Sequence, residues 1–206
     1  MKNQKGNDSI WSMIKLGLVL VCYAAASCTV LAIVNNFTAP KIAQNQIDKA
    51  NQAMKVVFED ATSFENISDF PKSTDKAILI SDFYIAKNND SILGAIVQVS
   101  GPTYDKGKII VGVNVDGTIS GMQILELTDS PGFGLKANDP SFKLPNGQTF
   151  YGQFTGKNAK NGFRNGNNFD AISGATITSD MIGNLVDEGS NCILKYFEST
   201  SIGKKW

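Results

Sequence analysis

The chain has 206 residues, of which 42% are hydrophobic, with 19 basic and 19 acidic side chains and no histidine. This length and apolar content allow one packed domain with an appendage. The formal net charge of zero argues against nucleic acid as the main partner. The lack of histidine excludes His-ligated zinc, haem and blue copper, and it excludes catalysis by Ser-His-Asp or Cys-His groups. We therefore expect no metal site.

The three cysteines do not indicate a disulfide scaffold or an iron–sulfur centre. Cys22 and Cys28 lie inside an apolar run, and Cys192 lies near the C-terminus. No Cys-x-x-Cys pair is present, so iron–sulfur ligation is not predicted. We interpret all three as inert packing residues.

An uncharged run of 19 residues, Leu16–Val34, predicts a transmembrane helix. As a helix it would span about 28 Å, close to the thickness of a bilayer's hydrocarbon core. Trp11 precedes it by about one turn, where an interfacial aromatic side chain is typical. A signal peptide cleaved after Ala26, or a lipoprotein anchored at Cys28, is an alternative. The length of the run favours an uncleaved anchor.

The charges beside this run predict its orientation. Lysines lie on both sides, and Lys15 lies nearest to the apolar residues. By the positive-inside rule this position favours a cytoplasmic tail over residues 1–15, so the body of the protein would face outward. A single-pass protein of the cell membrane, in contact with the lipid bilayer, is expected.

The segment 35–75 predicts a stalk helix followed by a loop. Residues 41–60 carry apolar side chains at helical spacing, and Pro40 suits the first turn of such a helix. Residues 61–75 are rich in Ser, Thr, Asp and Asn, which predicts a loop.

Residues 76–200 predict one α+β domain. Four strand-like runs are separated by short turns, which favours an antiparallel meander. After residue 178 an apolar face at helical spacing predicts a C-terminal helix that flanks the sheet, with Thr178 or Ser179 as its N-cap. The predicted strands are Ala77–Ala86, Ser91–Ser100, Lys108–Val115 and Ile119–Leu127.

The loop before this helix has the properties of an anion site. It reads DAISGATITS over residues 170–179, with small residues at Gly174 and Ala175 and hydroxyls at Ser173, Thr176 and Thr178. The free N–H groups and the dipole of a helix N-terminus favour a phosphate. An ordinary Ser/Thr helix cap is the alternative interpretation.

The same stretch resembles the flavinylation signal Asp-x-x-(Ser/Thr)-Gly-Ala-Thr of FMN-binding domains. Asp170, Ser173, Gly174, Ala175 and Thr176 occupy its specified positions. The resemblance implies that a separate flavin transferase takes FMN from FAD and joins the FMN phosphate to the hydroxyl of Thr176. It also implies an FMN site that includes the neighbouring Thr178. A phosphoester needs no histidine in the chain.

A second stretch supports this resemblance. Residues 107–134 are similar to a family segment that ends in Glu-Thr-Pro-Gly-Leu-Gly, which here reads DSPGFG. The resemblance implies flavin contacts from Ser130, Gly132, Phe133 and Gly134. A plain type II turn is the alternative. The family often has a histidine where this chain has Leu127, so any role of that histidine is absent here.

Two further residues, Arg164 and Cys192, are weaker candidates for flavin binding. Arg164 is the sole arginine and could steady a phosphate, although a solvent-facing arginine is the simpler interpretation. Cys192 as a cysteinyl flavin anchor is not expected, because it falls inside the predicted C-terminal helix.

The layout of the whole chain resembles the G subunit of the Rnf ion-translocating complex. This resemblance implies an electron-carrying component of a multisubunit ferredoxin:NAD oxidoreductase, with other membrane subunits as partners and no catalytic residue of its own. Alternatives are the C subunit of a sodium-pumping NADH:quinone oxidoreductase and a free-standing, membrane-anchored flavoprotein on the extracytoplasmic face. A non-redox anchored binding module is a further alternative.

Overall fold

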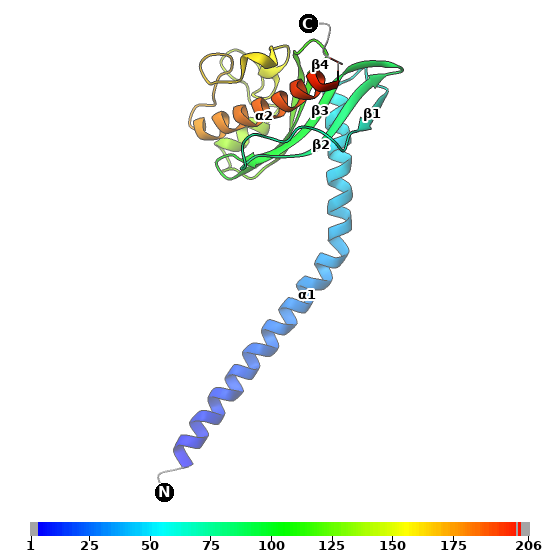
Figure 1. The fold of residues 1–206 in the computed structure, drawn as a ribbon. Coiled ribbons are helices and arrows are strands. Elements are labelled where there is room, and N and C mark those ends of the chain that lie inside the picture. The colour runs from blue at the N-terminus through cyan, green and yellow to red at the C-terminus, as the bar shows by residue number, and fades with distance from the viewer. Residues whose placement is uncertain (1–3, 201, 203–206) are drawn as a thin grey trace. The chain divides into compact units, whose positions relative to one another are not determined.

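The computed structural model of the protein describes residues 4–200 and 202, and their side chains from residue 11 onward. The chain divides into two compact units, residues 1–48 and 49–206. The predicted tail over residues 1–15 lies partly outside the described residues. The elements in chain order (Figure 1) are α1 (Gln4–Val57), β1 (Ser63–Asn66), β2 (Leu79–Asn88), β3 (Ser91–Pro102), β4 (Lys106–Asn114), β5 (Ile119–Leu127), the 3₁₀ helices η1 (Gly134–Asn138), η2 (Gly152–Phe154) and η3 (Ala159–Asn161), and α2 (Thr176–Thr200).

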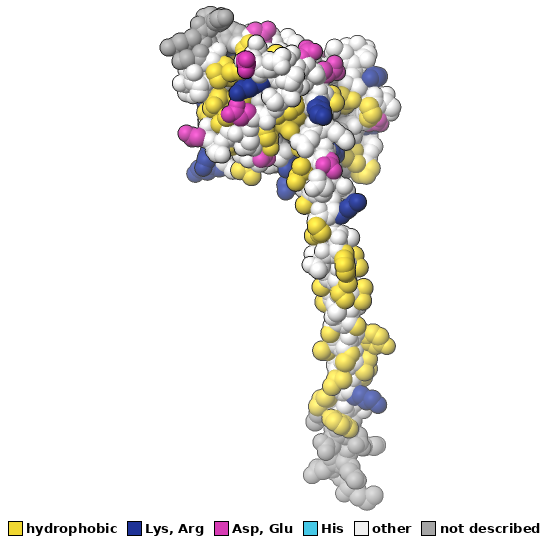
Figure 2. Space-filling model, turned by 90° about the vertical axis from the view of Figure 1, so that its right-hand side faces the viewer, with side chains coloured by type: hydrophobic (Ala, Val, Ile, Leu, Met, Phe, Trp, Pro, Cys, Tyr) yellow, Lys and Arg dark blue, Asp and Glu magenta, His cyan; other side chains and the backbone are white. Residues whose placement is uncertain are grey.

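The first unit is helical and carries its apolar side chains on the outside. Within the described part of the chain, α1 is the one helix long and apolar enough to cross a membrane. Hydrophobic side chains line the face of this helix that Figure 2 shows, and Trp11 is 71% exposed. The hydroxyls of Thr29 and Thr38 donate to the carbonyls of Ala25 and Val34, which satisfies them without water. These are properties of a membrane-spanning helix.

The prediction that Pro40 lies in the first turn of a separate stalk helix is wrong, because α1 runs through this residue without interruption. A proline inside a helix removes one N–H donor and costs about 3 kcal/mol. Helical residues flank Pro40 on both sides, and the helix tolerates the loss of this one hydrogen bond. The apolar run and the predicted stalk helix therefore belong to one element.

The second unit contains a five-stranded antiparallel sheet in the order β1-β2-β3-β4-β5. The antiparallel meander predicted for β2 to β5 is confirmed, and with it the α+β class. The edge strand β1 falls in the segment 61–75 that was predicted as loop. Its residues, Ser-Phe-Glu-Asn, have little strand character, and pairing with β2 from Ser63–Lys87 to Asn66–Tyr84 decides their conformation.

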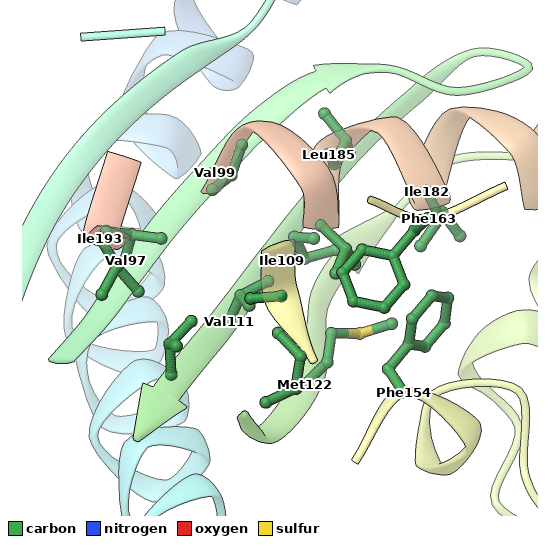
Figure 3. Close-up of a cluster of buried hydrophobic side chains, with 14 of the residues drawn as sticks. Val97, Val99, Ile109, Val111, Met122, Phe154, Phe163, Ile182, Leu185 and Ile193 are labelled. Atoms are coloured by element: carbon green, nitrogen blue, oxygen red, sulfur yellow. The ribbon is translucent and has the colours of Figure 1, made fainter. Parts of the chain in front are cut away.

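One face of the sheet forms the main core beneath α2. Inward residues alternate along β3 and β4, as the period of two in a strand requires. Side chains of α2 and of the loops before it complete this core (Figure 3). Its labelled members are Val97, Val99, Ile109, Val111, Met122, Phe154, Phe163, Ile182, Leu185 and Ile193.

The opposite face of the sheet packs against the last residues of α1 and the turn after it. Ala53, Met54, Val57 and Phe58 form a second buried cluster there with strand residues that include Ile96 and Ile110. Glycines leave the room for them. A Cβ at Gly112 would lie 2.3 Å from Val57 Cγ1, so this position accepts no side chain. The sheet is therefore buried on both faces.

Candidate functional site

A tight turn precedes α2 and shapes the site. Within it the N–H of Ala175 donates to the carbonyl of Ile172 over 2.9 Å, and Gly174 has φ +81°. This is the position of a type II turn that requires positive φ, which glycine adopts without strain. The hydroxyl of Ser179 donates to the Ala175 carbonyl and accepts from the Ile172 N–H. The turn is thereby fixed to the first turn of the helix.

The helix begins at Thr176, so the prediction of Thr178 or Ser179 as N-cap is wrong. The N–H of Ser179 already donates to the carbonyl of Ala175, four residues earlier. Both hydroxyl side chains are buried inside the helix and serve other partners. The N–H groups of residues 176–178 have no acceptor within the helix, because the first three N–H groups lack a preceding turn. Thr176 is exposed at this N-terminus.

The DSPGFG segment forms a second turn beside the helix. The N–H of Phe133 donates to the carbonyl of Ser130 over 3.3 Å, with Gly132 at φ +78° after Pro131. These positions fit the type II turn that the sequence indicates. Gly134 follows, and a Cβ there would lie 2.6 Å from Thr178 Oγ1. Glycine at this position lets the loop approach α2 closely.

A buried carboxylate joins these segments. Asp129 is 2% exposed and accepts hydrogen bonds from the hydroxyls of Thr103 and Thr178, each over 2.5 Å. It also accepts from the N–H groups of Asp105 at 3.0 Å and Tyr104 at 3.3 Å. Burial raises the pKa of Asp129, and the four hydrogen bonds together lower it by more than burial raises it. The pKa of Asp129 therefore lies below its ordinary value of 3.8. The carboxylate is therefore ionised at neutral pH.

The two turns, the hairpin after β3 and the start of α2 enclose a cavity of about 510 Å³. This volume lies within the usual range for small-molecule and cofactor sites. Seven of the predicted site residues line it, namely Ser130, Phe133, Gly134, Gly174, Ala175, Thr176 and Thr178. Gly132 and Ser173 are absent from its lining, although each belongs to a turn beside it. The site is therefore assembled from three separate segments, and the first and last of them, at Tyr104 and Gly174, lie 70 positions apart in the chain.

Two lining residues, Tyr104 and Ile177, were not predicted. Tyr104 lies between β3 and β4 and is 67% exposed, and Ile177 follows the flavinylation signal and is 57% exposed. No local pattern marks a tyrosine in a hairpin turn as a binding residue. The position next to Thr176 was the available signal for Ile177.

Asp170 lies away from this cavity. Its backbone exchanges two hydrogen bonds with the buried side chain of Gln153, and its carboxylate accepts from Asn146 over 3.3 Å. It lines a second, polar cavity of about 500 Å³ together with Lys157. Burial lowers the pKa of Lys157, while Asp170 acts in the opposite direction. Asp170 therefore orders the loop that leads to the turn and does not reach the cavity at Thr176.

The two weaker candidates also lie elsewhere. Arg164 is exposed and does not line the cavity, and its charge acts on the carboxyl of Asp187. Cys192 is buried in α2, where burial raises the pKa of its thiol to about 12. A thiol that stays protonated and buried is not a nucleophile. Neither residue supports a flavin contact.

The chemistry of the cavity suits a cofactor with an aromatic ring and an anionic end. The N-terminus of α2 offers free N–H groups and a favourable dipole to a phosphate. Exposed apolar side chains from Tyr104, Phe133 and Ile177 offer contacts to a flat ring. No acidic or basic side chain is among the residues that line it within the described part of the chain. An FMN group fits these residues.

Comparison with known proteins identifies the domain that contains this cavity. The FMN-binding domain family matches residues 104–191, and the RnfG N-terminal region matches residues 1–57. The chain is 30% identical to the G subunit of the ion-translocating oxidoreductase complex of Vibrio vulnificus, over 80% of this chain and 81% of that protein. It is 29% identical to the G subunit of the Na⁺-translocating ferredoxin:NAD⁺ oxidoreductase complex of Acetobacterium woodii, over 93% and 95%. It is 27% identical to the proton-translocating counterpart of Clostridium ljungdahlii, over 91% and 94%.

Proposed function

Because the chain belongs to the RnfG family, the G subunits of ion-translocating oxidoreductase complexes, we propose that it carries electrons through an FMN esterified to Thr176. The complex would be an Rnf-type ferredoxin:NAD oxidoreductase, in which this chain is one membrane-anchored redox component. One observation carries the proposal. Thr176 is exposed, begins α2 and lines the cavity of an FMN-binding domain.

The surroundings of the nearby hydroxyls support Thr176 as the attachment point. Thr178 is 2% exposed, and its hydroxyl already donates to Asp129. Ser179 is fully buried, and Ser173 lies outside the lining of the cavity. Ser130 is exposed and lines the cavity, but it lies in a turn and not at a helix N-terminus. Thr176 alone among these five combines exposure, the cavity and the helix N-terminus.

Attachment requires help from a second protein. The Oγ1 atom of Thr176 would attack the flavin-side phosphorus of FAD, the bond between the two phosphates would break, and AMP would leave. The hydroxyl proton must pass to a base. No carboxylate or amine is among the described residues that line the cavity. A flavin transferase would supply that base, and we propose such an enzyme as a maturation partner.

Once bound, FMN supplies the capacity to accept and release electrons. The chain's own residues hold and surround it. The N–H groups at the start of α2 would hold the phosphate, and the apolar lining would exclude water from the ring. A covalent tether makes retention of the cofactor independent of its affinity for the cavity. This suits a domain that we place on the extracytoplasmic face, where released FMN would be diluted.

The membrane unit supports the proposed location. α1 is an apolar helix near the N-terminus, and Lys15 lies at the N-terminal side of its uncharged run. We propose that the N-terminus is cytoplasmic and that the chain crosses the membrane once. The remaining subunits of the complex would then meet α1 within the lipid bilayer.

The attachment is tested by producing the full chain together with a flavin transferase and measuring flavin fluorescence of the denatured protein. Wild type and Thr176→Ser are expected to carry flavin, because both have a hydroxyl, and Thr176→Ala is expected to carry none. Ser130→Ala is the matched control, because it removes the other exposed hydroxyl of the cavity. Unlabelled wild type, with the transferase shown to be active on another protein, would refute the ester. Flavin that is lost in Ser130→Ala and kept in Thr176→Ala would place the ester at Ser130 instead.

Membership in a complex is tested separately. Affinity-tagged chain from its native membrane is expected to retain several polytopic subunits. Flavin-loaded protein without such partners would support the free-standing flavoprotein instead.

A further inference from the structure

Three large apolar side chains that the fold leaves exposed gather at one cavity. In the described part of residues 49–206, five large hydrophobic side chains are exposed: Val56, Leu79, Tyr104, Phe133 and Ile177. The last three line the cavity beside Thr176, and they come from three separate segments. Scattered exposed apolar residues need no explanation, but a cluster around a cavity marks a binding surface.

The backbone holds Tyr104 at this cavity. Its N–H donates to Asp129, and so do the hydroxyl of Thr103 before it and the N–H of Asp105 after it. Three consecutive residues of the hairpin therefore converge on one buried carboxylate. The same carboxylate accepts from the hydroxyl of Thr178, in the first turn of α2. This arrangement fixes the position of Tyr104 relative to the helix that begins with Thr176.

Phe133 is held near Thr176 by a different set of contacts. A Cβ at Gly174 would lie 3.5 Å from Phe133 Cδ1, so this ring packs over the glycine two residues before Thr176. Gly134, in the same loop, lies so close to Asp129 and Thr178 that a Cβ there would be within 2.7 Å of both. The ring of Phe133 is nevertheless 58% exposed. The positions of Tyr104 and Phe133 beside the cavity are thus fixed by contacts of their own segments. No charged side chain lines this cavity in the described part of the chain.

We propose that Tyr104 is a ring-binding residue, and that it and Phe133 contact the isoalloxazine ring of FMN. This inference rests on the proposed function, because the ring is placed here by a phosphate attached to Thr176. Flat aromatic groups pair favourably with tyrosine and phenylalanine rings. The chain has no histidine, and no charged side chain lines the cavity among the residues that the structure describes, so these rings position the flavin by shape and apolar contact.

The test compares full-length wild type with Tyr104→Ala, Tyr104→Gln and Tyr104→Phe, each loaded by a flavin transferase. Leu79→Ala is the matched control, because Leu79 is 64% exposed on β2 and does not line the cavity. Covalent load is measured on denatured protein. The environment of the ring is measured on folded protein, at equal load, by flavin fluorescence and visible-region circular dichroism.

Wild type, Tyr104→Phe and Leu79→Ala are expected to show a strong visible dichroism from an immobilised flavin. Tyr104→Ala and Tyr104→Gln are expected to lose most of it and to fluoresce several-fold more strongly, with unchanged load per folded protein. Equal dichroism and fluorescence in wild type and both ring-deleted variants would overturn the inference. Since Tyr104 is 67% exposed, its removal should leave the thermal unfolding midpoint of the flavin-free protein unchanged.

Failure of the ester would be visible as an unlabelled wild type. The ring site is then tested with excess free FMN. Dichroism induced in wild type and lost in Tyr104→Ala would support the ring site without the ester, and its absence in wild type would overturn both.

Discussion

The Oγ1 atom of Thr178 donates a 2.5 Å hydrogen bond to Oδ2 of Asp129, 49 positions earlier in the chain. The bond joins the first turn of α2 to the loop after β5. Because Asp129 also holds the hairpin between β3 and β4, one carboxylate fixes three sides of the proposed flavin site. Several properties of the protein should depend on this contact.

Replacing the buried carboxylate should destabilise the second unit. Asp129→Asn keeps the shape but offers only one acceptor oxygen to four donors. We expect the free energy of unfolding to fall by about 2–3 kcal/mol, since hydrogen bonds to a charged group are strong and its donors would be left unsatisfied. Urea unfolding measures this loss. Asp139→Asn is the control, because Asp139 is exposed and bonds only within its own turn. Equal losses in both variants would refute the role of Asp129.

The same carboxylate should make stability depend on acid. The folded pKa of Asp129 lies below 3.8. Its contribution is therefore complete above the unfolded pKa and is lost as the pH falls through the folded value. We expect the stability difference between wild type and Asp129→Asn to shrink below about pH 4.

The pH series must compare the two proteins and not wild type alone. Asp187 has a pKa raised by burial and by Glu188, so it binds its proton more readily in the folded state and acts in the opposite direction. A difference that stays constant from neutral pH to acid would contradict the ionised state of Asp129.

The turn before α2 should be needed for flavin attachment. Gly174→Ala places a side chain at φ +81°, which costs about 1–2 kcal/mol, while its Cβ would make only an ordinary contact with Phe133. We expect the turn to shift Thr176 and reduce the covalent flavin load. Gly156→Ala is the matched control, because it has φ +78° and open space around it, away from the cavity. It should lose similar stability and keep its flavin. Full load in Gly174→Ala would show that attachment tolerates a distorted turn.

The packing of residues 53–58 on the sheet should depend on glycine at position 112. The Cβ of Gly112→Ala would lie 2.3 Å from Val57 Cγ1 and 2.8 Å from the ring of Phe58. We expect a loss of about 1–3 kcal/mol from overpacking, measured by urea unfolding. Gly121→Ala is the control, because its Cβ would meet Val57 at an ordinary 3.5 Å. The prediction is wrong if the two variants unfold alike.

Several features of this protein could be predicted from the sequence because they depend on near neighbours. The uncharged run before Asn35 predicts a helix that can cross a membrane, and α1 has this character. Alternating apolar residues with short turns predict β2 to β5, and hydrogen bonding between adjacent strands confirms them. The DAISGATITS motif predicts a loop that runs into a helix, and α2 begins at its seventh residue. Each pattern is complete within about twenty residues, so local preference decides it.

Only the tertiary structure decided the features that combine distant segments. β1 is a strand because β2 supplies its hydrogen bonds, although its four residues alone favour a loop. Thr178 and Ser179 are buried helical residues and not caps, because Asp129 and the Ala175 carbonyl accept their hydroxyls. Tyr104 reaches the cavity because a carboxylate 25 positions away binds its N–H. Such contacts depend on how the sheet and α2 pack together, and no local pattern of residues encodes that packing.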